Sequence, residues 1–227
     1  MTRPVRITLA TFAWVLLFVV ALLADRAVAQ WAFDTRPLSH APWLIPVFRA
    51  PGNFWFTACI ALLLVVTRPE LWRRGAFLLL SGIIGGLIYS LVKWTVGRLR
   101  PFKPSPAEFQ PFTIHPFQHG LRGLINEPNQ AFPSGHGTLA FATAAALGMM
   151  FPKWRWLFYP LAAVVAVERI LEWAHYPSDT VAAAFIGWIS ALLALALCKR
   201  WTLSPFETTL SNSTNRQDPQ ARIGAAQ

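Results

Sequence analysis

The sequence predicts an all-α, polytopic membrane protein: a helical bundle with six transmembrane helices. Hydrophobic residues make up 55% of the 227 residues and charged residues only 13%, too little polar surface for a soluble domain of this size. Several apolar stretches approach the ~20 residues that a helix needs to cross a bilayer, and backbone pairing in lipid favours helices over open strands. The second and fourth stretches are short and are expected to borrow flanking residues, such as 43–48 before the second. The six stretches lie at roughly 7–24, 53–67, 76–92, 137–151, 156–173 and 180–198.

The chain begins with an apolar stretch and ends with a polar tail. The first apolar stretch fits a membrane anchor or a cleaved signal peptide, because the Ala-Val-Ala of residues 27–29 resembles a signal-peptidase site. The stretch is long for a signal peptide, and Asp25 and Arg26 interrupt its approach to that site, so we expect an anchor. Residues 1–202 are predicted to form the transmembrane domain. The polar tail, 203–227, is predicted to be disordered because it has little to bury.

The distribution of Lys and Arg predicts that both termini are cytoplasmic, since connecting segments on the inner side of a membrane carry more of these residues. The inner segments hold clearly more cations once Lys93, Arg100 and Arg169 are set aside for the chemistry described below. Two long connecting segments, about 25–52 and 93–136, then lie on the outer face.

Charge and cysteine content exclude other classes of protein. The formal net charge is +10, but a nucleic-acid binder gathers its Lys and Arg on one polar face or arm. Here they lie mainly in the short gaps between apolar stretches, so we exclude a nucleic-acid partner. The only cysteines, Cys59 and Cys198, lie inside apolar stretches and form neither a disulfide framework nor a metal-ligand spacing.

Ionisable residues at membrane depth are costly, so clusters of them are candidate functional sites. The first cluster holds Lys93 and Arg100, seven residues apart at the end of the third stretch. If the helix continues, two turns separate them and their side chains point the same way, which suits a multivalent anion. Snorkelling toward lipid headgroups is the alternative, and for this cluster alone we favour it.

The second cluster is Pro-Ser-Gly-His at residues 133–136, immediately before the fourth stretch. Ser134 is a good N-cap residue, and the free N–H groups of a helix start bind anions. Gly135 allows a ligand to approach the backbone closely. A plain helix cap explains Ser134 but leaves His136 unexplained.

The third cluster, Arg169, His175 and Asp179, spans the turn between the fifth and sixth stretches. A carboxylate four residues after a histidine can orient one ring nitrogen and leave the other as a base or nucleophile. Pro177 is expected to break the helix between them, so contact between the two side chains depends on the geometry of the turn. The structural alternative pairs Arg169 with a neighbouring glutamate and makes Asp179 the cap of the sixth helix.

The predicted topology brings all three clusters to the outer face, where three cations, a helix start and two histidines assemble. Such a group is costly to bury without a ligand and suits a tetrahedral oxyanion. The convergence therefore favours an active site at the outer face over three unrelated features.

Together the clusters resemble the signature of the type 2 phosphatidic acid phosphatase superfamily of membrane lipid phosphatases. That signature is Lys, six residues, Arg-Pro; then Pro-Ser-Gly-His; then Ser-Arg, five residues, His, three residues, Asp. The matching positions here, in the same order and spacing, are Lys93, Arg100, Pro101, 133–136, Arg169, His175 and Asp179. One position departs, because Glu168 stands where the family has Ser. Neighbouring helical residues point about 100° apart, so its carboxylate can face away from a bound phosphate.

The resemblance implies a metal-independent phosphatase with no cofactor, and the sequence offers no compact carboxylate cluster suited to a metal. It makes His175 the nucleophile that forms a phosphohistidine, with Asp179 fixing its tautomer. It makes His136 the acid that protonates the departing alkoxide and then the base that activates water. The positions that would hold the phosphate oxygens are Lys93, Arg100, Ser134, Gly135 and Arg169.

The implied function is hydrolysis of a lipid phosphate or pyrophosphate in the bacterial inner membrane, with the site facing the periplasm. Polyprenyl pyrophosphate, phosphatidic acid, phosphatidylglycerol phosphate and a phosphorylated glycolipid all remain open as substrates. One alternative transfers phosphate from a polyprenyl pyrophosphate to another lipid. A second is a non-enzymatic protein that binds anionic lipid, which needs cations but not paired histidines. Vanadium haloperoxidases have a similar site but are soluble. The sequence does not indicate the oligomeric state.

Overall fold

The computed structural model describes residues 3–101, 114–117, 130–201 and 205–206. Within these ranges every regular element is helical, apart from two isolated β-bridges that join Arg98 to Ile114 and Leu99 to Gln130. The all-α prediction is confirmed for this part of the chain. The predicted tail, 203–227, lies outside the described residues except for 205–206.

Helices cover all six predicted stretches. A six-residue helix, α2 (Leu44–Arg49), and the short turns η1 (Ala50–Gly52), η2 (Pro69–Leu71) and η5 (Pro152–Trp154) join them. The six main helices are α1 (Arg3–Thr35), α3 (Phe54–Thr67), α4 (Trp72–Val96), α5 (Gly135–Met150), α6 (Arg155–Leu171) and α7 (Pro177–Arg200).

Among the described residues, three helical segments are long and apolar enough to cross a membrane: Thr8–Thr35, Pro69–Val96 and Pro177–Arg200. A fourth span results if Leu44–Gly52 and α3, which meet at a bend of 66°, count as one broken helix. Many large apolar side chains on these helices are exposed, as expected for surfaces that contact lipid. The protein is therefore an integral membrane protein. Six spans remain a prediction, because α5 and α6 have only 16 and 17 residues.

The first helix is longer than the apolar stretch that predicted it. The stretch ends near residue 24, but α1 continues to Thr35, into the segment predicted to connect the first two spans. The Asp25 carboxylate lies within this helix, fully buried and paired inside the protein. Residues 43–48, expected to extend the next helix, contribute to α2, which precedes α3 across the bend of 66°.

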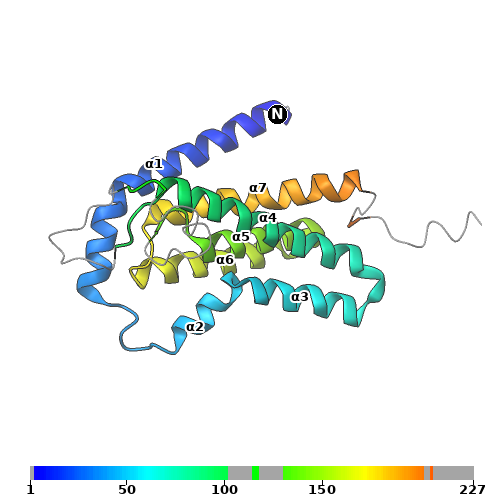
Figure 1. The fold of residues 1–227 in the computed structure, drawn as a ribbon, viewed down its shortest axis with the longest axis horizontal. Helices are drawn as coiled ribbons and strands as arrows, with labels where there is room; N and C mark the ends of the chain where they lie inside the picture. The colour runs from blue at the N-terminus through cyan, green and yellow to red at the C-terminus, as the bar shows by residue number, and fades with distance from the viewer. Residues whose placement is uncertain (1–2, 102–113, 118–129, 202–204, 207–227) are drawn as a thin grey trace, which may run out of the picture.

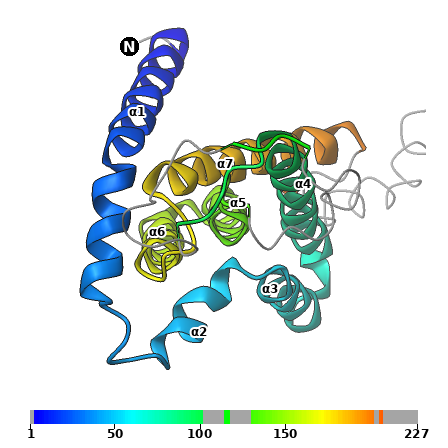
Figure 2. The ribbon, with the colours of Figure 1, turned by 60° about the vertical axis from the view of Figure 1, so that its left-hand side comes forward.

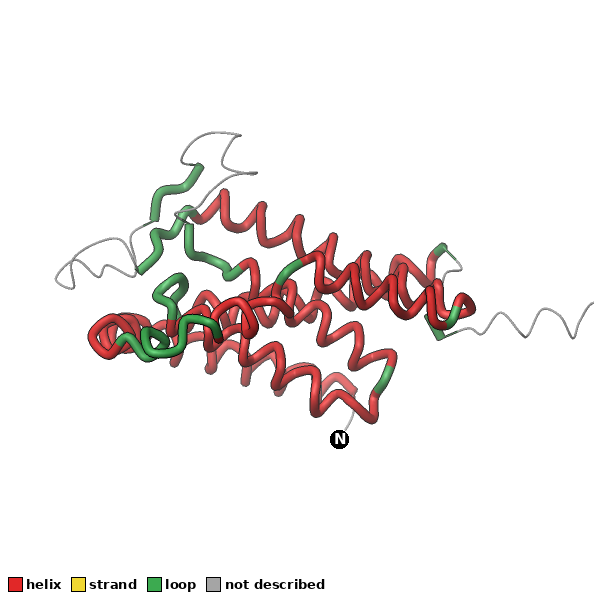
Figure 3. Tube along the Cα trace, turned by 90° about the horizontal axis from the view of Figure 1, so that it is seen from below, coloured by secondary structure: helices red, strands yellow, loops and turns green. Residues whose placement is uncertain are grey.

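Helix α5 lies at the centre of the bundle and packs against α4, α6 and α7, as Figure 2 shows. Helix α1 lies on the outside against α7, and its C-terminal part turns across one end of the bundle (Figure 1). The longer green loops gather mainly at one end of the bundle (Figure 3), and hydrogen bonds join the segment after α4 to the segment before α5, and the start of α5 to the start of α7. The bundle therefore presents the three sequence clusters at one end.

Close approach between α5 and α7 depends on Gly187. A Cβ atom added there would lie 2.6 Å from both the Thr138 carbonyl oxygen and the Ala142 nitrogen. We expect Gly187→Ala to destabilise the protein by about 1–3 kcal/mol, because the two backbones must separate. Gly86→Ala is the matched control, since a Cβ at Gly86 meets nothing within 4 Å. Thermal unfolding in detergent should show a lower Tm for Gly187→Ala only, and equal Tm values would contradict this packing.

Candidate active site

Backbone hydrogen bonds tie the three sequence clusters together. The Ser134 N–H donates to the Asp179 carbonyl oxygen at 3.2 Å, which joins the start of α5 to the start of α7. The Ala131 N–H donates to the Arg98 carbonyl oxygen at 2.6 Å, which joins the segment before α5 to the segment after α4. All three clusters thus meet at one end of the bundle.

His175 and Asp179 lie side by side in the turn before α7. The distance from His175 Nδ1 to Asp179 Oδ2 is 3.5 Å, and both side chains are buried. Pro177 does not separate them, because it is the first residue of α7 and the helix begins with it. The same Asp179 oxygen accepts the Tyr176 N–H at 2.8 Å, so it also caps the helix. The catalytic and structural interpretations of Asp179 therefore coexist.

The environment of His175 favours its neutral form. Burial, and then the positive charges of Lys93, Arg100 and Arg169, hold the pKa of His175 well below its usual range. A neutral imidazole keeps a lone pair on one nitrogen at neutral pH, as a nucleophile requires.

Arg100 reaches the site by a route that differs from the expected one. Helix α4 ends at Val96, and Gly97 follows in the left-handed conformation with φ of 61°, so the condition of a helix that continues from Lys93 to Arg100 is not met. A Cβ at Gly97 would lie 1.9 Å from the His115 carbonyl oxygen, so only glycine fits this turn. Arg100 Nε donates to the Gln130 carbonyl oxygen at 3.0 Å. Burial and the nearby Arg169 lower the pKa of Arg100 to about 10, so it stays charged at neutral pH.

The Pro-Ser-Gly-His segment forms the start of α5. Ser134 is the N-cap, and its Oγ accepts the Gly137 N–H at 3.3 Å. His136 follows in the first turn and is half-buried. A Cβ at Gly135 would lie 3.2 Å from the Tyr89 ring, so packing against α4 also requires a small residue there.

Glu168, the departure from the family signature, is directed at Arg49 of α2. Arg49 Nη2 lies 3.0 Å from Glu168 Oε1, and Arg49 also binds Glu172. Arg169 Nη1 lies 2.6 Å from Glu172 Oε2, so the ion pair expected as its structural role is present. Arg169 Nε is buried without a hydrogen-bond partner among the described residues. A buried donor of this kind is available to an anion.

Sequence reasoning missed Asp25, Arg98 and Arg49. Arg98 binds both Asp25 of α1 and Asp179 of α7. Asp25 had a detectable signal, because it is an ionisable residue at the end of a long apolar stretch. Arg49 had none, since its pairing with Glu168 depends on how α2 folds back against α6.

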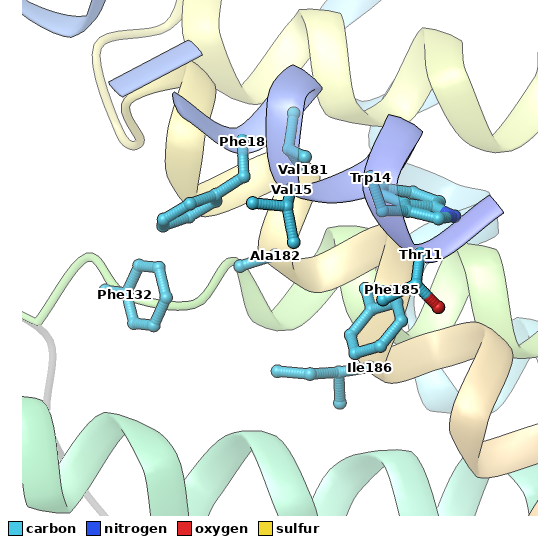
Figure 4. A pocket seen from close by; sticks show the side chains of 9 residues that line it. All are labelled: Thr11, Trp14, Val15, Phe18, Phe132, Val181, Ala182, Phe185 and Ile186. Atoms are coloured by element: carbon cyan, nitrogen blue, oxygen red, sulfur yellow. The ribbon is translucent and has the colours of Figure 1, made fainter. Parts of the chain in front are cut away.

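An apolar cavity of about 320 Å³ lies between α1 and α7, beside this end of the bundle (Figure 4). Phe132 lines it two residues before Ser134, and Val181 lines it two residues after Asp179. The remaining lining residues are Thr11, Trp14, Val15, Phe18, Ala182, Phe185 and Ile186.

The arrangement supplies a neutral histidine oriented toward a carboxylate, a second histidine at a helix start, and at least three cations. These groups can bind an anion and carry out nucleophilic and acid–base chemistry on it. In the described part of the chain, no three His, Cys, Asp or Glu side chains gather in a way that could hold a metal ion.

Comparison with known proteins gives a family and several relatives. The sequence model of the PAP2 superfamily matches residues 74–203, more than half of the chain. Lipid A 1-phosphatase of Rhizobium etli is 34% identical over 126 residues, which cover 55% of this chain and 51% of that protein. Undecaprenyl-diphosphatase of Sulfolobus acidocaldarius is 30% identical over 135 residues, 58% of each chain. The chain thus spans about half the length of the Rhizobium relative.

Two solved structures share the fold. LpxE of Aquifex aeolicus aligns with a TM-score of 0.55 at 18% identity, covering 76% of this chain and 94% of that one. A transmembrane PAP2 type phosphatidylglycerolphosphate phosphatase of Bacillus subtilis also has a TM-score of 0.55, at 19% identity, covering 83% and 96%.

Proposed function

Because this chain belongs to the PAP2 superfamily, we propose that it hydrolyses a lipid phosphate or pyrophosphate through a phosphohistidine intermediate. The observation that carries this proposal is the environment of His175, which is buried beside Asp179. Burial and the positive charges of Lys93, Arg100 and Arg169 lower its pKa and so favour the neutral imidazole. An anion-binding protein needs the cations but gains nothing from an oriented neutral imidazole among them.

The proposed first step gives the two ring nitrogens of His175 separate roles. Asp179, whose Oδ2 lies 3.5 Å from His175 Nδ1, would hold the proton on Nδ1 and leave the lone pair on Nε2. Nε2 attacks phosphorus, the bond to the lipid oxygen breaks, and His136, which the negative charge of the bound phosphate keeps protonated, gives its proton to the departing alkoxide. The contact to Asp179 is long for a hydrogen bond and is expected to tighten when the imidazole becomes positively charged.

The second step returns the enzyme to its starting state. His136, now neutral, takes a proton from a water molecule that attacks phosphorus, and the bond to Nε2 breaks to release inorganic phosphate. Throughout both steps Lys93, Arg100 and Arg169 neutralise the non-bridging oxygens. Ser134 and the Gly135 amide lie at the start of α5, where N–H groups also attract an anion.

The apolar cavity supports a lipid rather than a soluble phosphate ester. Its lining comes from α1, α7 and Phe132, in direct sequence continuity with Ser134 and Asp179. We assign it to the hydrocarbon chain of the substrate, because a chain in this position places its headgroup near the two histidines. Burial of about 25 cal/mol per Å² of apolar surface then contributes to binding.

Ala182→Phe, which fills this cavity, tests that assignment. We expect it to raise KM for a long-chain lipid phosphate by roughly tenfold and to leave a short-chain water-soluble analogue unaffected, because only the long chain needs the cavity. Ala163→Phe on α6 is the control, since Ala163 is exposed and does not line the cavity. Equal KM changes for both substrates, or no change for either, would show that the hydrocarbon chain of the substrate binds elsewhere.

We place the protein in the bacterial inner membrane with six spans, both termini cytoplasmic and the site at the periplasmic face. The excess of Lys and Arg in the inner segments supports this orientation. Cysteine accessibility scanning at exposed positions such as His40 and Lys153 would check it, because these lie on opposite faces in the proposed topology.

The direct test is phosphate release from a panel of lipids by the purified protein in detergent. The panel includes a phosphorylated glycolipid and a polyprenyl pyrophosphate, the substrate classes in the names of the relatives. We expect release of inorganic phosphate from at least one lipid, undiminished by a chelator. Strict Mg²⁺ dependence would argue against the mechanism, and release from none would argue against hydrolysis.

A further inference from the structure

Two aspartates from distant parts of the chain share one arginine. Arg98 Nη2 lies 2.6 Å from Asp25 Oδ2 on α1, and Arg98 Nη1 lies 2.5 Å from Asp179 Oδ1 on α7. All three side chains are buried, with Asp25 and Asp179 fully inaccessible and Arg98 4% exposed. Burying three charges is costly, so such a network persists only when its geometry is well satisfied.

Ser178 completes the network on the side of α7. Its N–H donates to Asp25 Oδ1 at 2.9 Å, and its Oγ donates to Asp25 Oδ2 at 2.5 Å. Arg98 Nη1 donates to the same Oγ at 2.7 Å. Asp25 therefore holds both the guanidinium that binds Asp179 and the backbone of the residue immediately before Asp179.

The two oxygens of Asp179 have separate partners. Oδ1 binds Arg98, whereas Oδ2 faces His175 Nδ1 and accepts the Tyr176 N–H. Arg98 also stacks on the Tyr176 ring, 4.2 Å from its centroid. The direction in which Asp179 presents Oδ2 to the imidazole thus depends on where Arg98 lies, and Asp25 holds Arg98 from the opposite side.

We propose that Asp25 is a positioning residue for the nucleophile, acting through Arg98 and Ser178 on Asp179 and so on His175. Without the negative charge of Asp25, the Arg98 guanidinium binds Asp179 alone. It then draws the Asp179 carboxylate away from the His175 imidazole. This inference rests on the proposed function. It also makes α1, which lies outside residues 74–203 matched by the family model, part of the catalytic machinery.

Asp25→Asn tests the role with little change of shape, because an amide oxygen can still accept the Ser178 N–H. We expect kcat for the lipid substrate to fall by roughly 10- to 100-fold, as for other groups that orient a reactive ligand or side chain. KM should stay within about threefold, because Asp25 does not contact the substrate. Asp34→Asn is the matched control on the same helix, since Asp34 is exposed and bonds only to Gln30 in the described structure.

A double-mutant cycle separates positioning from simple stabilisation of the fold. If Asp25 acts through Asp179, the Asp25→Asn change should cost little further kcat in a protein that already carries Asp179→Asn. A merely structural role predicts that Asp25→Asn lowers kcat by the same factor with and without Asp179→Asn, in parallel with the decrease in Tm. That additive result would overturn the proposal, as would full kcat in a folded Asp25→Asn protein.

Asp25→Glu serves if Asp25→Asn cannot be recovered folded. It keeps the charge but moves the carboxylate by one methylene group, so we expect a reduced kcat with a Tm closer to that of the unchanged protein. Full kcat in Asp25→Glu would then overturn the proposal. Failure of the proposed function looks different, because the unchanged protein would itself release no phosphate from any lipid.

Discussion

His175→Ala is expected to lower kcat for phosphate release by at least about 10³-fold while leaving the protein folded. The substitution removes the side chain that we propose as the nucleophile, so the first step loses the group that forms the bond to phosphorus. His175 lies in the turn between α6 and α7 rather than inside a helix, so its loss leaves the bundle packing in place.

The control for this variant is His40→Ala, which removes an exposed histidine outside the site. Both proteins should elute as a single species in detergent with similar Tm values. Phosphate release should persist in His40→Ala and vanish in His175→Ala. Substantial turnover by folded His175→Ala would show that another group is the nucleophile.

His136→Ala is expected to abolish lipid turnover but to spare part of the reaction with p-nitrophenyl phosphate. The alkoxide of a lipid is a poor leaving group, and in the proposed mechanism it takes a proton from His136, whereas nitrophenolate leaves without one. In the same mechanism His136 also activates the water that hydrolyses the phosphohistidine. The variant should therefore release nitrophenolate in a burst close to one equivalent per active site and then slow by about 10²- to 10⁴-fold.

Stopped-flow absorbance at high protein concentration measures this burst. The unchanged protein provides the comparison, since its two steps both proceed and its release continues at the steady rate. A steady, undiminished rate in His136→Ala would remove His136 from the second step. Complete absence of a burst in a folded protein would show that His136 is also needed for the first.

The sequence predicted the helices well because apolar length is a strong signal in membrane proteins. Helix α3 begins at Phe54, one residue from the predicted start, and its end at Thr67 matches. The end of α1 could not be predicted, since the charge of Asp25 is neutralised by Arg98, 73 residues later in the chain. Residues 43–48 were expected to be helical as an extension of α3, but the bend that makes α2 a separate helix was not predicted, because six residues are too few to show a period of their own.

The candidate site was predicted as a set of residues but not as a set of contacts. The three motif segments do meet at one end of the bundle, and His175 does lie beside Asp179. The ion pair between Glu168 and Arg49 could not be deduced from the sequence. It depends on the position of α2, which is followed by η1, and η1 packs against His136 at Gly52. A Cβ at Gly52 would lie 2.7 Å from the His136 carbonyl oxygen, a tertiary constraint with no local pattern.

The most direct test of the account is to identify the residue that carries the phosphoryl group during turnover. His136→Ala protein is mixed with ³²P-labelled p-nitrophenyl phosphate, whose leaving group needs no proton, and is then quenched without acid, digested and analysed by mass spectrometry. We predict one acid-labile, alkali-stable phosphoryl group on His175. A label on any other residue, or a folded protein that releases its burst of nitrophenolate without becoming labelled, would contradict a mechanism through phosphohistidine at His175.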